Sequence, residues 1–141
     1  MSEIEDFAWA VKTGDLPNVQ KFVNKGISVN VTDETVNKRT PLHWASDYGQ
    51  VDVLNFLVSK GANVEAKDAF GITPLLAAVY EGHENAVRFL VSKGANKNVK
   101  GPDGLTPLEA AEKESIRAIL RGKCNFFRYL LLIIYNPQQK G

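Results

Sequence analysis

Residues 40–45 read TPLHWA, and the same pattern returns as TPLLAA at 73–78 and as TPLEAA at 106–111. Each copy begins 33 residues after the previous one, as the start positions 40, 73 and 106 show. A second marker keeps this spacing, because SKGAN occupies residues 59–63 and again residues 92–96. Two separate markers with one period predict an array of repeats, in which each unit stacks on its neighbours.

The residues of one unit predict a pair of helices. Thr40 is a favourable N-cap, Pro41 fits the first helical position, and Gly49 can end the first helix in a left-handed conformation. The second helix has apolar residues spaced to form one buried face, namely Val51, Leu54, Leu57 and Val58. Since no unit can bury its apolar faces alone, we expect an all-α solenoid of about four stacked helix pairs with extended finger loops.

The two ends of the array depart from the repeat pattern. Residues 7–10 (FAWA) align with residues 42–45 at an offset of 35, so two extra residues lie in the loop within 30–40. In the last unit, Ile116 matches Val87 at an offset of 29, four residues fewer than the period. The sequence therefore predicts a longer first loop and a contracted connection between the last two helices. Atypical terminal units are typical of caps, which have a neighbour on one side only.

Composition argues against several classes of protein. The 141 residues are 44% hydrophobic, and 17 basic against 16 acidic side chains give a net charge of +1, which offers no basic footprint for nucleic acid. The single cysteine, Cys124, excludes an intramolecular disulfide and favours a reducing compartment. The acidic N-terminus lacks the layout of a signal peptide, and the apolar run 126–135 is shorter than the roughly 20 residues of a spanning helix. We expect a cytoplasmic protein, small enough to enter the nucleus as well, and a monomer.

The inventory of reactive side chains does not favour catalysis. The two histidines, His43 in the repeated hexad and His83 after Gly82, sit at positions of the repeat where a structural hydrogen bond is expected. Phosphate-binding glycine loops, HExxH and paired Cys-x-x-Cys motifs do not occur in the sequence. We therefore expect a protein-binding module without enzymatic activity, cofactor or metal.

Positions i, i+3 and i+4 of each first helix share one face, opposite Leu42 and Ala45, and we expect this face to line the concave side of the solenoid. The sets are Trp9, Lys12 and Thr13, then Trp44, Asp47 and Tyr48, then Ala77, Tyr80 and Glu81, then Ala110, Lys113 and Glu114. Trp and Tyr are enriched at interface hot spots. The alternative is that the aromatic residues only support packing between repeats and the acidic ones are only solvated.

The first finger, residues 31–39, is the longest and carries charges near its tip. Its acidic residues are Asp33 and Glu34, followed by Lys38 and Arg39. A charged loop can reach a partner or be only solvated, and the sequence leaves both open. The candidate partner-binding residues are thus Trp9, Asp33, Glu34, Trp44, Asp47, Tyr48, Tyr80 and Glu81.

The repeated hexad resembles the ankyrin repeat, whose signature is T-P-L-H-x-A. Longer segments resemble the myotrophin family, and this resemblance extends over residues 5–120. These segments are FAWA and GDL at 7–10 and 14–16, PLH and DYGQ at 41–43 and 47–50, ITPLL and AVYEGH at 72–76 and 78–83, and VKGPDGLT at 99–106.

The myotrophin resemblance implies a partner. Members of that family bind the heterodimeric actin capping protein and cover its basic actin-binding surface, so that barbed ends continue to grow. In this chain the acids Asp33, Glu34, Asp47 and Glu81 fit such a role, with Trp9 and Tyr80 as apolar anchors. Two alternatives remain open: a nuclear or cytoplasmic regulator that binds Rel-type transcription factors, and a structural adaptor whose C-terminal extension docks elsewhere.

We divide the chain into an ankyrin-repeat domain, residues 1–120, and an extension, residues 121–141. The four repeats are expected at approximately 5–37, 38–70, 71–103 and 104–120. The extension resembles nothing in the family, and its run 126–135 is nearly uncharged and prone to aggregation if exposed. It could pack on the fourth repeat, reach a membrane or partner, or come from an alternative or mistaken reading frame, which we favour.

Overall fold

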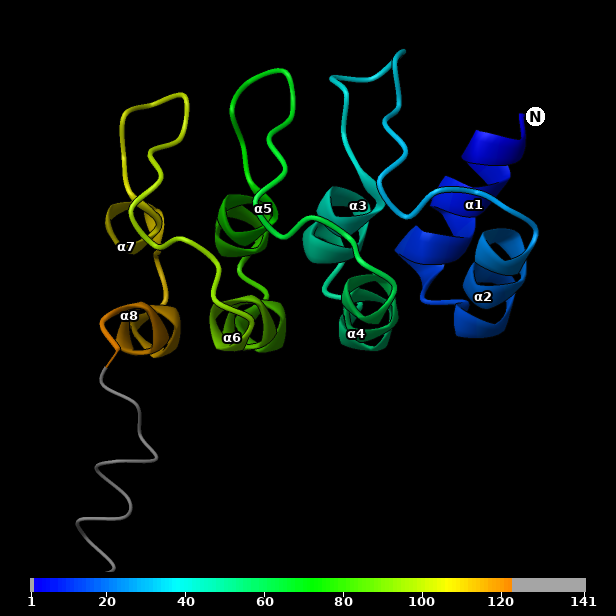
Figure 1. Cartoon of the computed structure of the whole chain (residues 1–141). Coiled ribbons are helices and arrows are strands. Elements are labelled where there is room, and N and C mark those ends of the chain that lie inside the picture. The colour runs from blue at the N-terminus through cyan, green and yellow to red at the C-terminus, as the bar shows by residue number, and fades with distance from the viewer. Residues whose placement is uncertain (1, 123–141) are drawn as a thin grey trace, which may run out of the picture.

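The computed structural model describes residues 2–122, in which eight helices and no strands form two parallel rows with loops projecting from one side (Figure 1). The inner helices, which lie next to the loops, are α1 (Glu3–Thr13), α3 (Pro41–Asp47), α5 (Pro74–Glu81) and α7 (Pro107–Ala110). The outer helices are α2 (Leu16–Asn24), α4 (Val51–Ser59), α6 (Glu84–Ser92) and α8 (Glu114–Leu120). The predicted solenoid of four helix pairs is confirmed. The expectations for residues 126–135 lie outside the described part of the chain.

The Thr-Pro pairs begin the inner helices as predicted, but they cap them in two ways. The Thr73 and Thr106 hydroxyls accept hydrogen bonds from the backbone N–H three residues later, each at 3.3 Å. Thr40 instead bonds to the His43 ring, whose Nδ1 lies 3.1 Å from the Thr40 nitrogen and 2.9 Å from its hydroxyl. In each case the cap fixes where the helix starts and hence which side chains face the next repeat.

The core runs continuously along the array, because each inner helix packs on the next. Phe7, Leu42 and Leu75 hold equivalent places in the first three pairs, and each is at most 1% exposed. The small Ala45 and Ala78 are fully buried and allow the helices to approach closely. None of the helices within residues 2–122 combines the length and the apolar character that crossing a membrane requires.

Hydrogen bonds from the outer helices tie each pair to the one before it. The N-cap residues of α4, α6 and α8 are Gln50, His83 and Lys113. Their side chains donate to the backbone carbonyls of Lys12, Asp47 and Gly82, at 2.9, 2.8 and 2.8 Å respectively. This connection fixes the C-terminal ends of the inner helices and shows a structural role for His83.

A glycine makes room for one of these bonds. Gly49 has a φ of +66°, and a Cβ on it would lie 2.7 Å from the His83 ring. Both the backbone conformation and the close approach therefore require glycine at the end of α3.

The three fingers close in the same way, but the first is longer than the other two. A backbone hydrogen bond joins residues 68 and 72 in the second finger and residues 101 and 105 in the third, whereas in the first it joins Asp33 and Arg39 at 3.0 Å. The two extra residues of the first finger therefore lie at its tip. There Asn37 and Lys38 adopt left-handed backbone conformations, with φ of +59° and +56°, which costs free energy for residues other than glycine.

Arg39 connects the first two fingers to the end of α3 through two ion pairs. Its guanidinium lies 2.7 Å from the Asp47 carboxylate and 3.0 Å from that of Asp68, which is fully buried. The other Asp68 oxygen accepts from the N–H groups of Phe70 and Ile72, each at 2.9 Å. One half-buried cation thus holds two carboxylates and, through them, two loops.

The fourth helix pair is shortened on the inner side. Helix α7 has 4 residues where α5 has 8, and the chain leaves it in an extended conformation at Ala111. The prediction of a contracted connection is wrong, because residues 111–113 between α7 and α8 form a longer connection than residues 82–83 between α5 and α6. The missing residues come from the second half of the inner helix itself.

We expect the free energy of unfolding to decrease as the pH falls from 7.5 to 5.5. His43 is fully buried, and its Nδ1 accepts the Thr40 N–H, so Nε2 must carry the proton and donate to the Ile72 carbonyl at 2.7 Å. Burial lowers the pKa of His43. In the unfolded chain this histidine becomes protonated near its ordinary pKa of about 6.5, and in the folded chain only at lower pH, so protons increasingly favour the unfolded state as the pH falls through this range.

Urea unfolding of the full chain at several pH values measures this dependence. The His43→Gln variant should be less stable at neutral pH but should show a flatter profile. An unchanged profile in that variant would show that His43 is not responsible.

We expect Arg39→Ala to lower the free energy of unfolding by about 2–3 kcal/mol, because it leaves the buried Asp68 carboxylate without its cation. The matched control is Arg88→Ala, which removes an exposed ion pair with Glu84 and should cost less than about 1 kcal/mol. Chemical unfolding followed by circular dichroism compares the two. Equal losses would mean that Arg39 does not hold the fingers.

Candidate protein-binding surface

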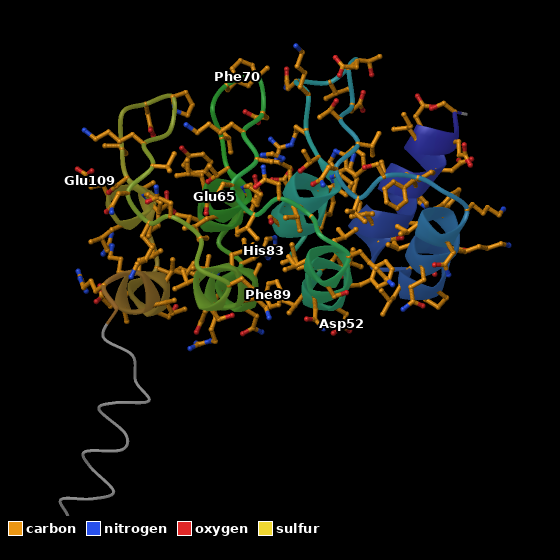
Figure 2. The ribbon with its side chains drawn as sticks, viewed as in Figure 1. Asp52, Glu65, Phe70, His83, Phe89 and Glu109 are labelled. Atoms are coloured by element: carbon orange, nitrogen blue, oxygen red, sulfur yellow. The ribbon has the colours of Figure 1, made fainter. Side chains whose placement is uncertain are left out.

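Exposed large hydrophobic side chains gather on one side of the molecule. Within residues 2–122 all of them lie on inner helices, at their ends or on fingers, and none lies on an outer helix: Trp9, Val36, Tyr48, Phe70, Tyr80 and Leu105. Phe70 stands at a finger tip, and Asp52 on the opposite, outer side (Figure 2). Exposed aromatic and aliphatic side chains on a single side are typical of a surface for another protein.

The structure brings three of the predicted residues together. Asp47, Tyr48 and Glu81 line one hollow of about 250 Å³ between the C-terminal ends of α3 and α5. Tyr48 is 54% exposed, and Glu81 is exposed and forms no ion pair among the described residues. We call this hollow and the neighbouring inner-helix ends the concave surface.

Asp47 contributes less free negative charge than its sequence position suggests. Its carboxylate pairs with Arg39 and is 27% exposed. Burial raises the pKa of Asp47, and the nearby Glu81 adds to this rise, although Arg39 opposes it. Asp47 therefore helps to hold the Arg39 network, whereas Glu81 presents its charge to solvent.

The prediction that Trp44 faces the concave surface is wrong. Its side chain is only 3% exposed, and its ring lies 6.1 Å from that of Phe7 in an edge-on arrangement. The equivalent Ala77 is 2% exposed. Trp44 therefore points at the preceding inner helix, and packing between repeats, the alternative considered for these aromatics, is its role.

The same geometry explains why Trp9 is exposed. Trp9 is the counterpart of Trp44 in the first pair, where no preceding inner helix covers it, and 68% of its surface is accessible. It therefore belongs to the exposed end of the stack formed by α1. The sequence correctly predicted that Trp9 is exposed. It grouped Trp9 with the residues of the concave surface, whereas Trp9 lies at the end of the stack.

The acids of the first finger have different surroundings. The Asp33 carboxylate accepts from the Thr35 N–H and hydroxyl at 2.9 and 2.6 Å, which lowers its pKa and shapes the turn. Glu34 is exposed and accepts from the Thr32 hydroxyl at 2.7 Å. Asp33 thus has a local structural role, and Glu34 is the more available of the two.

Sequence reasoning missed a second hollow, which is larger than the one lined by Asp47, Tyr48 and Glu81. A cavity of about 580 Å³ lies beside the shortened α7, and Tyr80, Glu81, Leu105 and Glu112 are among its lining residues. The signal was present, because the offset of 29 showed that residues were missing from the last unit. Within the described residues, no group of three or more His, Cys, Asp or Glu side chains could hold a metal ion.

Comparison with known proteins identifies the repeats. A family model described as ankyrin repeats, in three copies, matches residues 7–101 and 65–140. Myotrophin of Xenopus tropicalis is 53% identical over 59 residues, which cover 42% of this chain and 48% of that protein.

Other relatives match over similar lengths. An ankyrin repeat-containing protein of Schizosaccharomyces pombe is 41% identical over 66 residues, which are 47% of this chain and 31% of that protein. The 2-5A-dependent ribonuclease of Mus musculus is 39% identical over 69 residues, which are 49% of this chain and 9% of that protein. The chain spans less than half the length of each of these three relatives.

The family match covers most of the sequence, and the stacked helix pairs with projecting fingers agree with it. Repeats of this kind act by binding other proteins. The chain therefore belongs to the ankyrin-repeat family of protein-binding proteins, and it is myotrophin-like over the 59 matched residues.

Proposed function

We propose that this protein binds the heterodimeric actin capping protein and covers its basic actin-binding surface. Capping protein held in this way cannot block barbed ends, so filaments continue to grow. The mechanism is steric and electrostatic competition and involves no chemical reaction. Its place of action is the cytoplasm, where the filaments are.

The one-sided distribution of exposed hydrophobic residues is the observation that carries this proposal. Tyr48 and Tyr80 lie at the C-terminal ends of neighbouring inner helices, and Trp9 lies on α1 at the end of the same row. Large rigid side chains bury much area at little cost in conformational entropy. The outer helices offer no comparable anchor within the described residues.

The charges of the concave surface favour a basic partner. Glu81 lies between the two hollows and lines both. The nearby Arg39 forms ion pairs with Asp47 and Asp68, so it offers little positive charge to a partner. Opposite charge on the two surfaces speeds association and disfavours wrong partners.

The surface is also held in place before binding. The side chains of His83 and Lys113 bond to the carbonyls of Asp47 and Gly82, at the ends of α3 and α5 that carry Tyr48 and Glu81. A surface that is already ordered loses less entropy on binding. The similarity to myotrophin supports the identity of the partner, because that family is expected to act on capping protein.

We expect the full chain to restore elongation of actin seeds that have been blocked with capping protein. Fluorescence of labelled actin follows the growth of the seeds as the protein is added. If the seeds stay blocked while a Rel-type dimer binds the chain at micromolar concentration or below, the alternative partner is the correct one.

We expect Tyr48→Ala and Glu81→Lys each to weaken binding of capping protein by about 1–3 kcal/mol, since one removes an anchor and the other repels a basic surface. The matched control is Asp52→Lys, on the outer side of α4, which should change affinity by less than about 0.5 kcal/mol. Calorimetric titration measures all three. Equal losses for Glu81→Lys and Asp52→Lys would contradict a specific concave interface.

A further inference from the structure

The hollow beside α7 exists because the last inner helix is short. In the third pair, α5 runs for 8 residues to Glu81, but α7 stops after 4 residues and has no second half to cover α5 (Figure 1). The cavity of about 580 Å³ that results lies between α5, the third finger and the start of α8. Its volume is within the range of sites that hold a ligand group.

One part of its lining is aromatic and apolar. Tyr80, Leu105 and Ile116 come from α5, the third finger and α8 respectively. Tyr80 and Leu105 are 38% and 37% exposed. The Tyr80 hydroxyl lies so close to Gly101 that a Cβ at that position would overlap it. The third finger therefore holds the tyrosine in place against the hollow.

Carboxylates make up most of the charged lining. They are Glu81, Asp103, Glu109 and Glu112. Within residues 2–122 none of the four forms an ion pair. Hydrogen bonds from Thr106 lower the pKa of Glu109, so it stays ionised at neutral pH.

The two basic residues of the lining are already engaged by the protein itself. Lys113 donates from Nζ to the Gly82 carbonyl, and Arg117 donates from Nε to the Ala111 carbonyl, both at 2.8 Å. Arg117 also lies 3.5 Å from the Glu114 carboxylate. Neither cation is directed to the four carboxylates, so the hollow keeps an excess of negative charge beside an aromatic ring.

We propose that this hollow binds an arginine side chain from a basic segment of the partner protein. A planar guanidinium can stack on an aromatic ring and bond to carboxylates at the same time, whereas an ammonium group acts as a point charge. This inference rests on the proposed function. It adds that the partner contributes an arginine side chain to this hollow.

The test uses the full chain and the peptide acetyl-Gly-Arg-Gly-amide as the probe, followed by ¹H–¹⁵N NMR. We expect saturable shifts at the amides of Leu105, Glu112 and Lys113. The peptide with lysine should bind more weakly, and the peptide with citrulline, an uncharged group of the same shape, should give no saturable shift. Equal binding of the citrulline peptide, or no shift with the arginine peptide because the hollow is filled by another part of the chain, would overturn the proposal.

Two variants locate the binding. Glu112→Lys should raise the dissociation constant of the arginine peptide by about fivefold or more, since it replaces a lining carboxylate with a cation. Asp52→Lys makes the same change in charge on the outer side of α4 and should leave the constant within about twofold. Equal effects of the two variants would mean that the peptide responds only to overall charge.

This titration contains no capping protein, so it fails or succeeds independently of the proposed function. If the peptide binds in the hollow but blocked actin seeds do not grow, the identity of the partner is wrong and the arginine site stands. If the seeds grow but Glu112→Lys leaves peptide binding unchanged, the partner stands and the arginine site is wrong.

Discussion

The structure depends on the fact that no helix pair can bury its own apolar faces. Phe7, Leu42 and Leu75 are sealed only because each inner helix packs on the next. Trp44 shows the constraint directly, since its ring is covered by the preceding pair through Phe7. Trp9, at the same position in the first pair, has no preceding pair and is largely exposed. Stacking therefore decides which side chains form the core and which remain for a partner.

The same stacking builds the binding surface. The outer helices donate from their N-cap side chains to the ends of the preceding inner helices, and these ends carry Tyr48, Tyr80 and Glu81. Arg39 joins the first two fingers to α3. Where the array ends, a shortened α7 leaves the larger hollow open. The surface thus results from the regular stacking of the repeats and from the shortened helix α7.

Much of the fold could be predicted because its signals are local and periodic. The Thr-Pro pairs, the glycines and the apolar spacing predicted the helix pairs, and the offset of 35 predicted the longer first finger. The site was harder to predict because helical spacing groups residues on a face without saying what covers it. That limit produced the error at Trp44 and hid the pairing of Asp47 with Arg39, 8 residues away in the chain. For the hollow beside α7, the offset of 29 showed that residues were missing, but only the three-dimensional arrangement shows where they are missing and what lines the space.

Hydroxyl-radical footprinting of the full chain, free and bound to capping protein, tests most directly whether the concave surface is the interface. The account predicts that oxidation of Tyr48 and Tyr80 decreases in the complex. Phe56 and Phe89, on the outer helices α4 and α6, should be oxidised at the same rate in both states. Protection of these two phenylalanines, with Tyr48 and Tyr80 unchanged, would contradict the account.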